Sequence, residues 1–294
     1  MLELIKANLM FERLLKRPDI QKAYAMVKPT DSWFDTISKV HNSLAEIQKL
    51  PREQLEITSH DGLKLRGIYY PSNATCGKTV IFAHGYTSHA EREWAFPGLF
   101  YHSLGFNVLI PYQRAHGISE GKYISFGALE HRDMMNWVKL INDRNPEDQI
   151  LIHGLSMGGG VALYMADKEM KNVKGIIADA PNVSIDDFFH SFIGYKFKTG
   201  QDKIYTHVAK LFEKEFAVSF TGFDATKTVA ESRYPIFLCA GSREQMEEVF
   251  EKIKASNPQK TDILILPGCD HGNGMYKQTE LYQTNIKEFV NKYM

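Results

Sequence analysis

The spacing of apolar positions in residues 1–50 is that of one face of a helix, with apolar side chains three or four residues apart. The clearest run consists of Trp33, Phe34, Ile37, Val40, Leu44 and Ile47. After Pro51 the pattern changes to alternation, and the segments EQLEITS and LKLRGIYY flank Asp61-Gly62, a turn typical of a β-hairpin. The sequence therefore predicts a helical N-terminal extension over residues 1–50, followed by a hairpin.

From residue 78 onward, near-continuous apolar runs alternate with helical patterns. The predicted strands cover residues 78–85, 106–111, 149–154, 173–181, 234–241 and 261–268. The predicted helices cover residues 91–105, 128–142, 156–170, 244–256 and 282–293, the first of them kinked or shortened by Pro97. Such alternation is typical of a mostly parallel sheet with helices on both faces. With the hairpin, the pattern predicts an α/β fold built on an eight-stranded sheet.

One long stretch, residues 182–230, contains no strand pattern of comparable quality. It is rich in phenylalanine, tyrosine and lysine, and an unstructured loop of that length is uncommon. We therefore expect a helical cap inserted into the core, which then comprises residues 51–181 and 231–294. The aromatic side chains of the cap either form its own core or line a pocket above an active site. Trp33 and Phe34 would join that pocket if the N-terminal helices fold over it.

Charge and composition exclude several classes of function. The chain has 35 Lys and Arg and 35 Asp and Glu residues, so no basic excess points to nucleic acid or an anionic membrane surface. No apolar run approaches the roughly 18 residues of a membrane span, and Glu3 and Lys6 interrupt the start of the chain, where a signal peptide is apolar. We therefore expect a cytoplasmic protein. The cysteines, Cys76, Cys239 and Cys269, have unrelated spacings, so neither a disulfide framework nor a zinc site is expected.

A serine stands among glycines between the strand predicted over 149–154 and the helix predicted over 156–170. The segment GLSMG has the form G-x-S-x-G, which in this context predicts a nucleophile elbow. Such a sharp turn holds the Ser156 hydroxyl at the carboxyl edge of the sheet, and side chains two residues away would clash, so Gly154 and Gly158 fill those places. Ser156 is therefore the candidate nucleophile.

A serine hydroxyl needs a base to remove its proton, and that base is commonly a histidine held by a carboxylate. In the elbow architecture the chain order is serine, acid and histidine, and each residue lies just after a strand. His271 follows the strand predicted over 261–268, and Glu244 follows the strand predicted over 234–241. The sequence therefore predicts His271 as the base and Glu244 as the acid.

Acyl transfer also needs two backbone N–H groups that stabilise the oxyanion. One is expected from Met157, directly after the nucleophile. The other is expected from Tyr86, in the loop after the strand predicted over 78–85. His84 and Gly85 precede Tyr86, and we expect them to support the turn of this loop.

Together these segments resemble the α/β-hydrolases, and most of all a bacterial branch with an N-terminal helical extension and a helical cap, described as serine aminopeptidase-like or acylaminoacyl-peptidase-like. The matching segments occur in family order over roughly residues 55–294 and are SHDGLKLRGIYY, VIFAHGYTS, RAHGISEGKY, HGLSMGG and PGCDHGNG. The resemblance implies an α/β-hydrolase fold with Ser156 as nucleophile, His271 as base, and Tyr86 and Met157 as oxyanion donors.

The chain departs from the family pattern in two places. Where the family has Asp-x-Arg-Gly-His-Gly, residues 112–117 are YQRAHG, and we expect a repacked loop with the chemistry retained. Where the family commonly has Gly-Asp-x-Asp, residues 241–244 are GSRE, so Glu244 stands in for an aspartate. Asp179, near the end of the strand predicted over 173–181, is the alternative acid. If neither acid serves, the chain is a weakened or inactive hydrolase.

The resulting hypothesis is a serine hydrolase that cleaves a carboxylic ester or a small amide through a Ser-Glu-His triad. Its expected partner is a small-molecule ester or a peptide-like substrate, with no cofactor and no metal, because the chain lacks H-E-x-x-H, clustered Cys and His, and a G-x-G-x-x-G after its first parallel strand. The alternatives are an aminopeptidase or acyl-peptide hydrolase, acyl transfer to an alcohol or amine, and a hydrolase-fold binding protein. The sequence leaves the oligomeric state open.

Overall fold

The computed structural model describes residues 2–19, 33–74 and 77–294 of the chain. Its strands are β1 (Glu53–Thr58), β2 (Lys64–Tyr70), β3 (Lys78–Ala83), β4 (Asn107–Pro111), β5 (Gln149–Leu155), β6 (Val173–Asp179), β7 (Ile236–Gly241) and β8 (Thr261–Leu266). Its α-helices are α1 (Leu2–Leu15), α3 (Ile37–Ile47), α4 (Ala90–Ser103), α5 (Glu130–Arg144), α6 (Met157–Leu163), α7 (Ile185–Lys196), α8 (Gln201–Phe216), α9 (Ala225–Ala230), α10 (Glu247–Ser256), α11 (Gly274–Lys277) and α12 (Thr279–Tyr293). Cys76 and residues 20–32 of the predicted extension lie outside the described residues.

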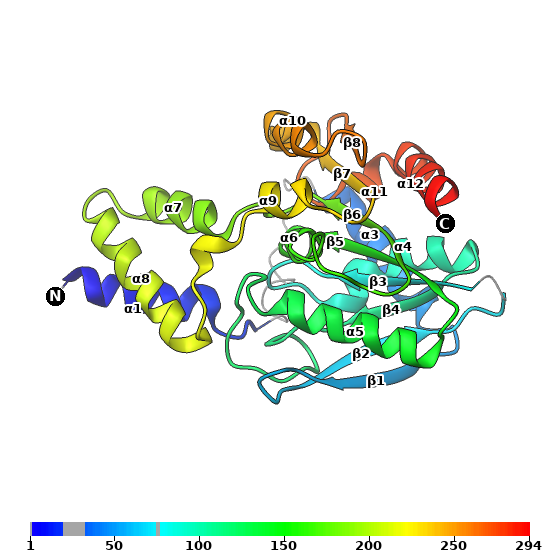
Figure 1. The fold of residues 1–294 in the computed structure, drawn as a ribbon, viewed down its shortest axis with the longest axis horizontal. Coiled ribbons are helices and arrows are strands. Elements are labelled where there is room, and N and C mark those ends of the chain that lie inside the picture. Colours follow the sequence, from blue (N-terminus) through cyan, green and yellow to red (C-terminus); the bar gives the residue numbers. More distant parts are fainter. Residues whose placement is uncertain (1, 20–32, 75–76) are drawn as a thin grey trace.

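In the described part of the chain the strands form one sheet of eight, in the order β1-β2-β4-β3-β5-β6-β7-β8 (Figure 1). The β1–β2 hairpin is antiparallel, and β2 also runs antiparallel to β4. All pairs from β4 to β8 are parallel. The predicted α/β fold with a mostly parallel eight-stranded sheet is therefore confirmed.

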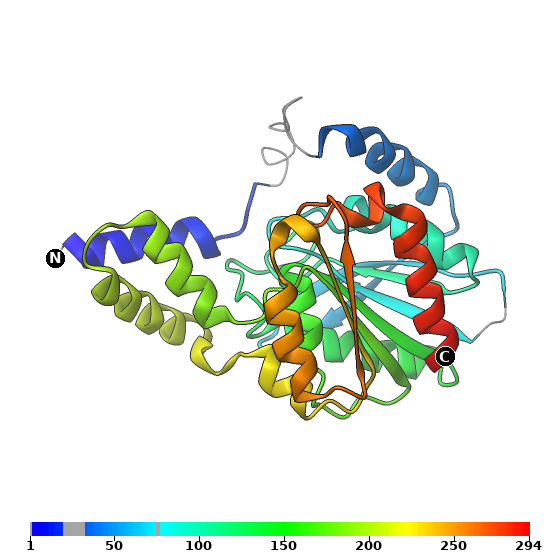
Figure 2. The ribbon, with the colours of Figure 1, turned by 90° about the horizontal axis from the view of Figure 1, so that it is seen from above.

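Helices cover both faces of the sheet, as Figure 2 shows from above. Strand β3 illustrates why, because alternate side chains along a strand point to opposite faces. Ile81 and Ala83 belong to one buried apolar cluster, together with residues of α5, α6 and α10. Val80 and Phe82 belong to the other, together with residues of α4 and α12. A strand buried on both faces must be apolar throughout, which is the pattern seen in the sequence.

The register of the parallel strands brings the predicted site segments together. Ala83 of β3 pairs with Gly154 of β5, so the loop that follows β3 lies beside the turn that contains Ser156. Gly241 of β7 pairs with Leu266 of β8, so the loops that follow these two strands are also neighbours. Both pairs lie at the carboxyl edge of the sheet, where open α/β sheets carry their sites.

Two predicted helices differ from the observed ones. Helix α4 continues through Pro97, although proline cannot donate the hydrogen bond to the carbonyl four residues earlier. That carbonyl belongs to Glu93, and it accepts a hydrogen bond from the Tyr276 hydroxyl at 3.2 Å instead. Helix α6 ends at Leu163, well short of the expected residue 170, because the chain goes on through tighter turns such as Ala166 N–H to Leu163 O.

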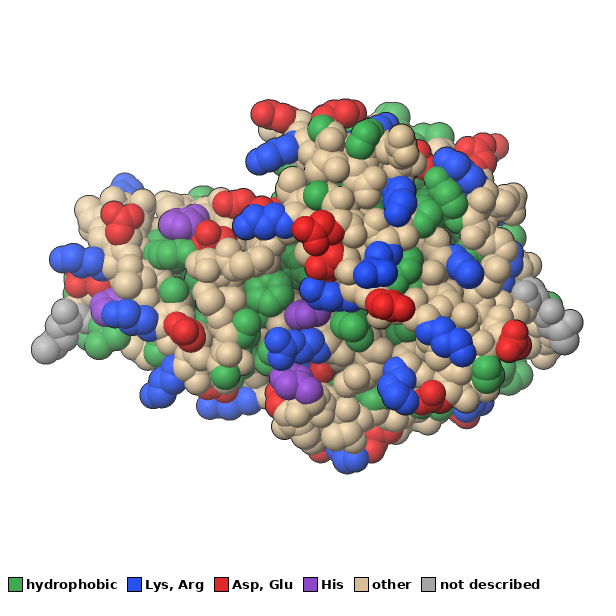
Figure 3. All heavy atoms as spheres, in the orientation of Figure 1, with side chains coloured by type: hydrophobic (Ala, Val, Ile, Leu, Met, Phe, Trp, Pro, Cys, Tyr) green, Lys and Arg blue, Asp and Glu red, His purple; other side chains and the backbone are tan. Residues whose placement is uncertain are grey.

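The inserted residues form an arm that projects from the core, and an antiparallel bridge between Ser184 and Asp224 closes its base (Figure 1). Helices α7 and α8 pack on each other, and α1 lies along α8. In contrast, α3 packs against α4 on the core. The boundaries predicted at residues 50, 181 and 230 stay predictions, while the two N-terminal helices pack against different parts of the molecule. On the face shown in Figure 3, acidic and basic side chains are interspersed over arm and core alike.

Candidate active site

Ser156 lies in a sharp turn between β5 and α6 and has φ 57° and ψ −117°, a strained conformation for a residue other than glycine. The turn is tight on both sides of the serine. A Cβ atom on Gly154 would lie 2.1 Å from the backbone oxygen of Gly158, and one on Gly158 would lie 2.0 Å from the backbone oxygen of Ala83. Only glycine fits at these positions, and this arrangement is that of a nucleophile elbow.

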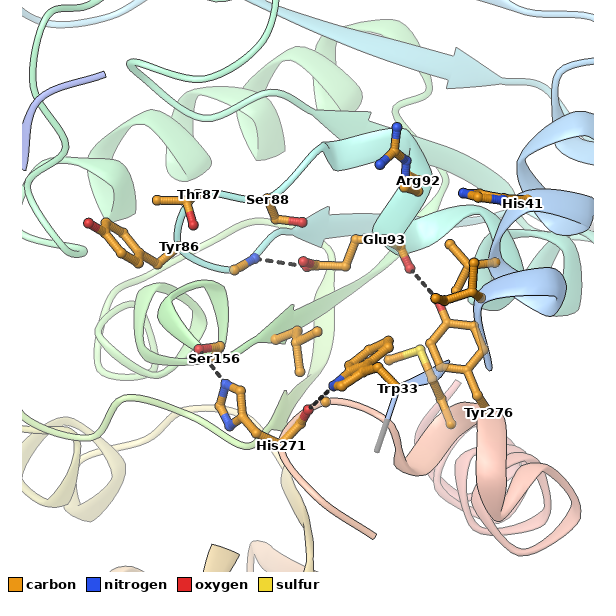
Figure 4. Close-up of a pocket in the computed structure, with 16 residues that line it drawn as sticks. Trp33, His41, Tyr86, Thr87, Ser88, Arg92, Glu93, Ser156, His271 and Tyr276 are labelled. Carbon is orange, nitrogen blue, oxygen red and sulfur yellow. Dashed lines mark hydrogen bonds between the residues drawn. The ribbon is translucent and has the colours of Figure 1, made fainter. Parts of the chain in front are cut away.

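His271 contacts both other members of the predicted triad, and Figure 4 shows its contact with Ser156. Its Nε2 lies 2.9 Å from the Ser156 hydroxyl, and its Nδ1 lies 2.6 Å from Oε2 of Glu244. A carboxylate only accepts, so Nδ1 carries the proton and Nε2 is left to accept the serine proton. The hydrogen bond with Glu244 raises the pKa of His271 above its usual 6.5, although burial opposes the shift. The extra methylene of a glutamate therefore does not prevent contact.

Glu244 is itself held in place, because its Oε1 accepts a hydrogen bond from the backbone N–H of Gly241 at 2.8 Å. Asp179, the alternative acid, is directed elsewhere. Its Oδ2 accepts a hydrogen bond from the Tyr282 hydroxyl at 3.2 Å, and burial raises its pKa to about 7. Of the two candidate acids, Glu244 is the one that contacts the histidine.

The loop after β3 is fixed around Gly85. The N–H of Gly85 donates to Oε1 of Glu93 at 2.8 Å, and the oxygen of Gly85 lies 2.8 Å from Nδ1 of the buried His84. Farther along, the Tyr86 hydroxyl donates to the backbone oxygen of Leu14 in α1 at 2.7 Å, and its ring stacks on Phe126. The backbone of this loop is thus held from α4, from α1 and from its own histidine.

Met157 is the first residue of α6, which begins directly after Ser156. The first N–H groups of a helix have no partner within the helix and carry its positive dipole end. The N–H of Met157 is therefore placed to serve an anion beside the serine. The loop after β3 lies close by, since a Cβ atom on Gly85 would be 3.5 Å from Cβ of Ser156.

A cavity of about 360 Å³ opens beside Ser156. Its walls come from the loop 85–88, from the segment 271–276, and from Trp33, Ile37 and Val40 before and within α3. None of its described lining residues comes from residues 182–230. The aromatic side chains there pack on one another, as Phe189, Phe212 and Phe220 do. The first alternative for the cap aromatics, a core of the cap itself, is the one the structure favours.

Comparison with known proteins agrees with the fold. Residues 75–218 match the family described as serine aminopeptidase, S33. The fold is similar to that of an esterase from Pyrococcus furiosus, with a TM-score of 0.65 and 28% identity over 84% of this chain and 92% of that one. The chain is an α/β-hydrolase.

Other relatives cover less of the molecule or share only its fold. The uncharacterized protein YqkD of Bacillus subtilis is 32% identical over 149 residues, which is 50% of this α/β-hydrolase and 48% of that protein. The chain therefore spans about half the length of that curated relative. Est1E of Butyrivibrio proteoclasticus, solved with ferulic acid bound, has a TM-score of 0.62 at 18% identity, over 81% of this chain and 98% of that one, and shows the fold alone.

Sequence reasoning missed one residue of this α/β-hydrolase site, Glu93, and one contact of a second, Trp33. Glu93 lines the cavity, and burial raises its pKa to about 7. An acidic residue in the first turn of the helix after the loop 85–88 was the available signal. Trp33 was considered only for a pocket wall, but its Nε1–H also donates to the backbone oxygen of His271 at 3.2 Å. Phe34, named together with Trp33, is 45% exposed and does not line the cavity.

No group of His, Cys, Asp and Glu side chains with the geometry of a metal site occurs among the residues that the structure describes. In the same part of the chain Cys239 and Cys269 are free thiols, and no helix is both long and apolar enough to cross a bilayer.

Proposed function

We propose that the chain is a serine hydrolase that cleaves a carboxylic ester, with a small amide as the variant within the same chemistry. The observation that carries the proposal is the unbroken chain of contacts from the Ser156 hydroxyl through His271 to Glu244, at 2.9 and 2.6 Å. A non-catalytic binding protein has no need of an acid in contact with the histidine, so this contact favours the enzyme. The similarity to the Pyrococcus furiosus esterase supports the same conclusion.

In the proposed mechanism Oγ of Ser156 attacks the ester carbonyl carbon while Nε2 of His271 takes the hydroxyl proton. Glu244 holds the protonated Nδ1 and stabilises the imidazolium that forms. The N–H groups of Met157 and Tyr86 stabilise the oxyanion. The bond to the alcohol then breaks, and His271 returns its proton to the departing oxygen. Water, deprotonated by the same histidine, attacks the acyl-serine and releases the carboxylic acid.

The test is intact-mass labelling with a fluorophosphonate, which reacts with activated serines. We expect one adduct per wild-type chain and none on Ser156→Ala. Absence of labelling on folded wild-type protein would overturn the proposal and leave a binding role. A series of p-nitrophenyl esters then measures turnover, and product analysis with an added alcohol or amine separates hydrolysis from acyl transfer.

The acid is tested by a matched pair of variants. Glu244→Gln removes the charge that contacts His271, whereas Asp179→Asn removes the charge of a buried carboxyl that does not contact it. We expect a large loss of kcat only for Glu244→Gln. The opposite order would assign the role of the acid to Asp179.

A further inference from the structure

The segment before and within α3 forms one side of the cavity beside Ser156. In Figure 4 Trp33 and Tyr276 lie on the side of the cavity away from Tyr86, with Ser156 and His271 between the two sides. Ile37 and Val40 come from the next two turns of the chain and also face the cavity. The other described walls come from the loops at the sheet edge and from α4 and α11.

Ile37 and Val40 give the α3 wall an apolar part, which Leu155 and Met275 extend, while His41 of the same helix adds a polar side chain. Ligand pockets commonly range from about 300 to 1,000 Å³. At about 360 Å³ the cavity lies near the lower end, so a single side chain changes a large share of its space. The apolar part of such a pocket fits an unbranched or small apolar group.

Trp33 fixes this wall to the catalytic histidine. Its indole N–H donates to the backbone oxygen of His271, and its ring packs edge-on against Tyr276 with centroids 5.7 Å apart. A Cβ atom on Gly272, the residue after the histidine, would lie 3.4 Å from the Trp33 ring. The position of α3 is thus set relative to the same loop that carries the base.

The inserted helices are the usual expectation for a substrate wall, but here they contribute nothing to the described cavity. Phe192 of α7 packs on Phe188 and lines a separate hollow on the arm, beside α1. We therefore expect a substitution at Phe192 to leave the cavity unchanged.

We propose that Val40 and Ile37 of α3, rather than the inserted helices, set the size of the apolar part of the ester that the site accepts. This inference rests on the proposed function, and it names a substrate class: esters with a short apolar group on one side of the carbonyl. Enlarging Val40 shortens the group that fits, and reducing Val40 admits a longer one.

The experiment compares Val40→Phe, Val40→Ala and wild type on two ester series. One series lengthens the acyl group with p-nitrophenol constant, and the other lengthens the alcohol with acetate constant. We expect Val40→Phe to lower kcat/KM for the longest good substrate by at least about tenfold, the scale of one or more methylenes in an apolar pocket, and Val40→Ala to move the optimum to longer groups. The series whose optimal chain length changes in the Val40 variants identifies which side of the carbonyl, acyl or alcohol, occupies the cavity.

Two controls separate pocket shape from stability. Leu44→Ala removes apolar volume from the same helix at a position that does not line the cavity, and Phe192→Ala does so in α7. We expect both to keep the wild-type optimum. Unmoved optima in both Val40 variants, or a shift in Phe192→Ala, would overturn the inference.

A second measurement does not depend on turnover. Calorimetric titration of the Ser156→Ala protein with straight-chain methyl ketones of rising length reports the size of the cavity directly. We expect the tightest-binding length to fall when Val40→Phe is added. If Val40→Phe changes the tightest-binding ketone length, but wild-type protein neither reacts with the fluorophosphonate nor turns over an ester, the proposed function fails while the assignment of the wall stands. If Val40→Phe leaves that length unchanged, the assignment of the wall is wrong.

Discussion

The backbone N–H of Gln113 donates a hydrogen bond to Nε2 of His84 at 3.0 Å. This contact determines the tautomer, because a nitrogen that accepts leaves the proton on Nδ1, which then donates to the backbone oxygen of Gly85. In a trans peptide the C=O and the following N–H point in opposite directions. His84 therefore turns the N–H of Tyr86 away from itself. Burial lowers the pKa of His84 well below its usual value, so this arrangement persists as the pH falls.

From this we predict that His84→Leu loses much of its kcat with little change in KM, since the Tyr86 N–H is no longer held toward the oxyanion. Removing an oxyanion donor outright costs about 10²- to 10³-fold in kcat, which sets the upper bound. Steady-state kinetics on variants with wild-type thermal unfolding measures the effect. His102→Ala serves as the control, as its ring contacts Pro71 far from the serine. An unchanged kcat in folded His84→Leu would contradict the prediction.

The raised pKa of His271 predicts the pH dependence of the reaction. The base acts only when neutral, so kcat/KM should rise with pH along a limb whose midpoint lies above 6.5. Glu244→Gln removes the main cause of the shift, so its limb should move to lower pH while kcat falls by up to about 10⁴-fold, as for other triads that lose their acid. The measurement is kcat/KM from pH 5 to 9 at constant ionic strength.

Glu93 titrates in the same range, since its pKa is about 7, and it provides the control for that profile. In Glu93→Gln the limb should persist and move only slightly to lower pH, because the charge of Glu93 is a minor cause of the raised pKa of His271. A limb that disappears in Glu93→Gln and does not move in Glu244→Gln would assign the observed pKa to Glu93 and contradict the prediction.

The raised pKa of Asp179 predicts that the stability of the fold depends on pH. Burial raises its pKa from 3.8 to about 7, so the folded state binds the proton more tightly than the unfolded chain does. The stability that this proton contributes is complete below pH 3.8 and is lost as the pH rises through 7, in total on the order of 4 kcal/mol. Asp179→Asn has no such proton to lose. The free energy of unfolding, measured in urea at pH 5 and 8.5, should increase for Asp179→Asn relative to the wild type at the higher pH. An equal difference between the two proteins at both pH values would contradict this.

Arg114 carries a large share of the stability of its loop. Its buried guanidinium donates to both oxygens of Asp133, at 2.7 and 2.8 Å, and to both oxygens of Asp61. Arg114→Ala leaves Asp133 buried without its partner, and such losses cost about 3–5 kcal/mol. Arg114→Lys should recover little, because an ammonium group cannot form the two-pronged contact. Urea midpoints test this, with Lys139→Ala on an exposed ion pair as the control that should change little.

The contacts among Ser156, His271 and Glu244 were predictable from the sequence because their signals are local. Ser156 is recognisable from the glycines two residues before and after it. His271 and Glu244 each follow an apolar run that forms a buried strand. Sheet topology then brings the ends of those strands together without further information. The hairpin was predictable for the same reason, since Asp61-Gly62 lies between two alternating segments.

Other features depended on side-chain packing between distant segments. Trp33 contacts a backbone oxygen 238 residues away, and no local pattern encodes that pairing. The loop at residues 112–117 shows that the preference for glycine at a positive φ is not absolute. Ala115, where the resembled family has glycine, adopts φ 59° and tolerates the left-handed conformation. The continuity of α4 through Pro97 likewise depends on a hydroxyl from Tyr276, which arrives from the far end of the chain.

The contact between α1 and α8 also bears on how the chain is made. Met10, Phe11 and Leu14 are buried in the arm, against helices that the ribosome synthesises only after most of the core. During translation the apolar side chains of α1 stay exposed until α8, the helix it packs against, has been synthesised. We therefore expect the docking of α1 onto α8 to be a late step in the folding of the newly made protein.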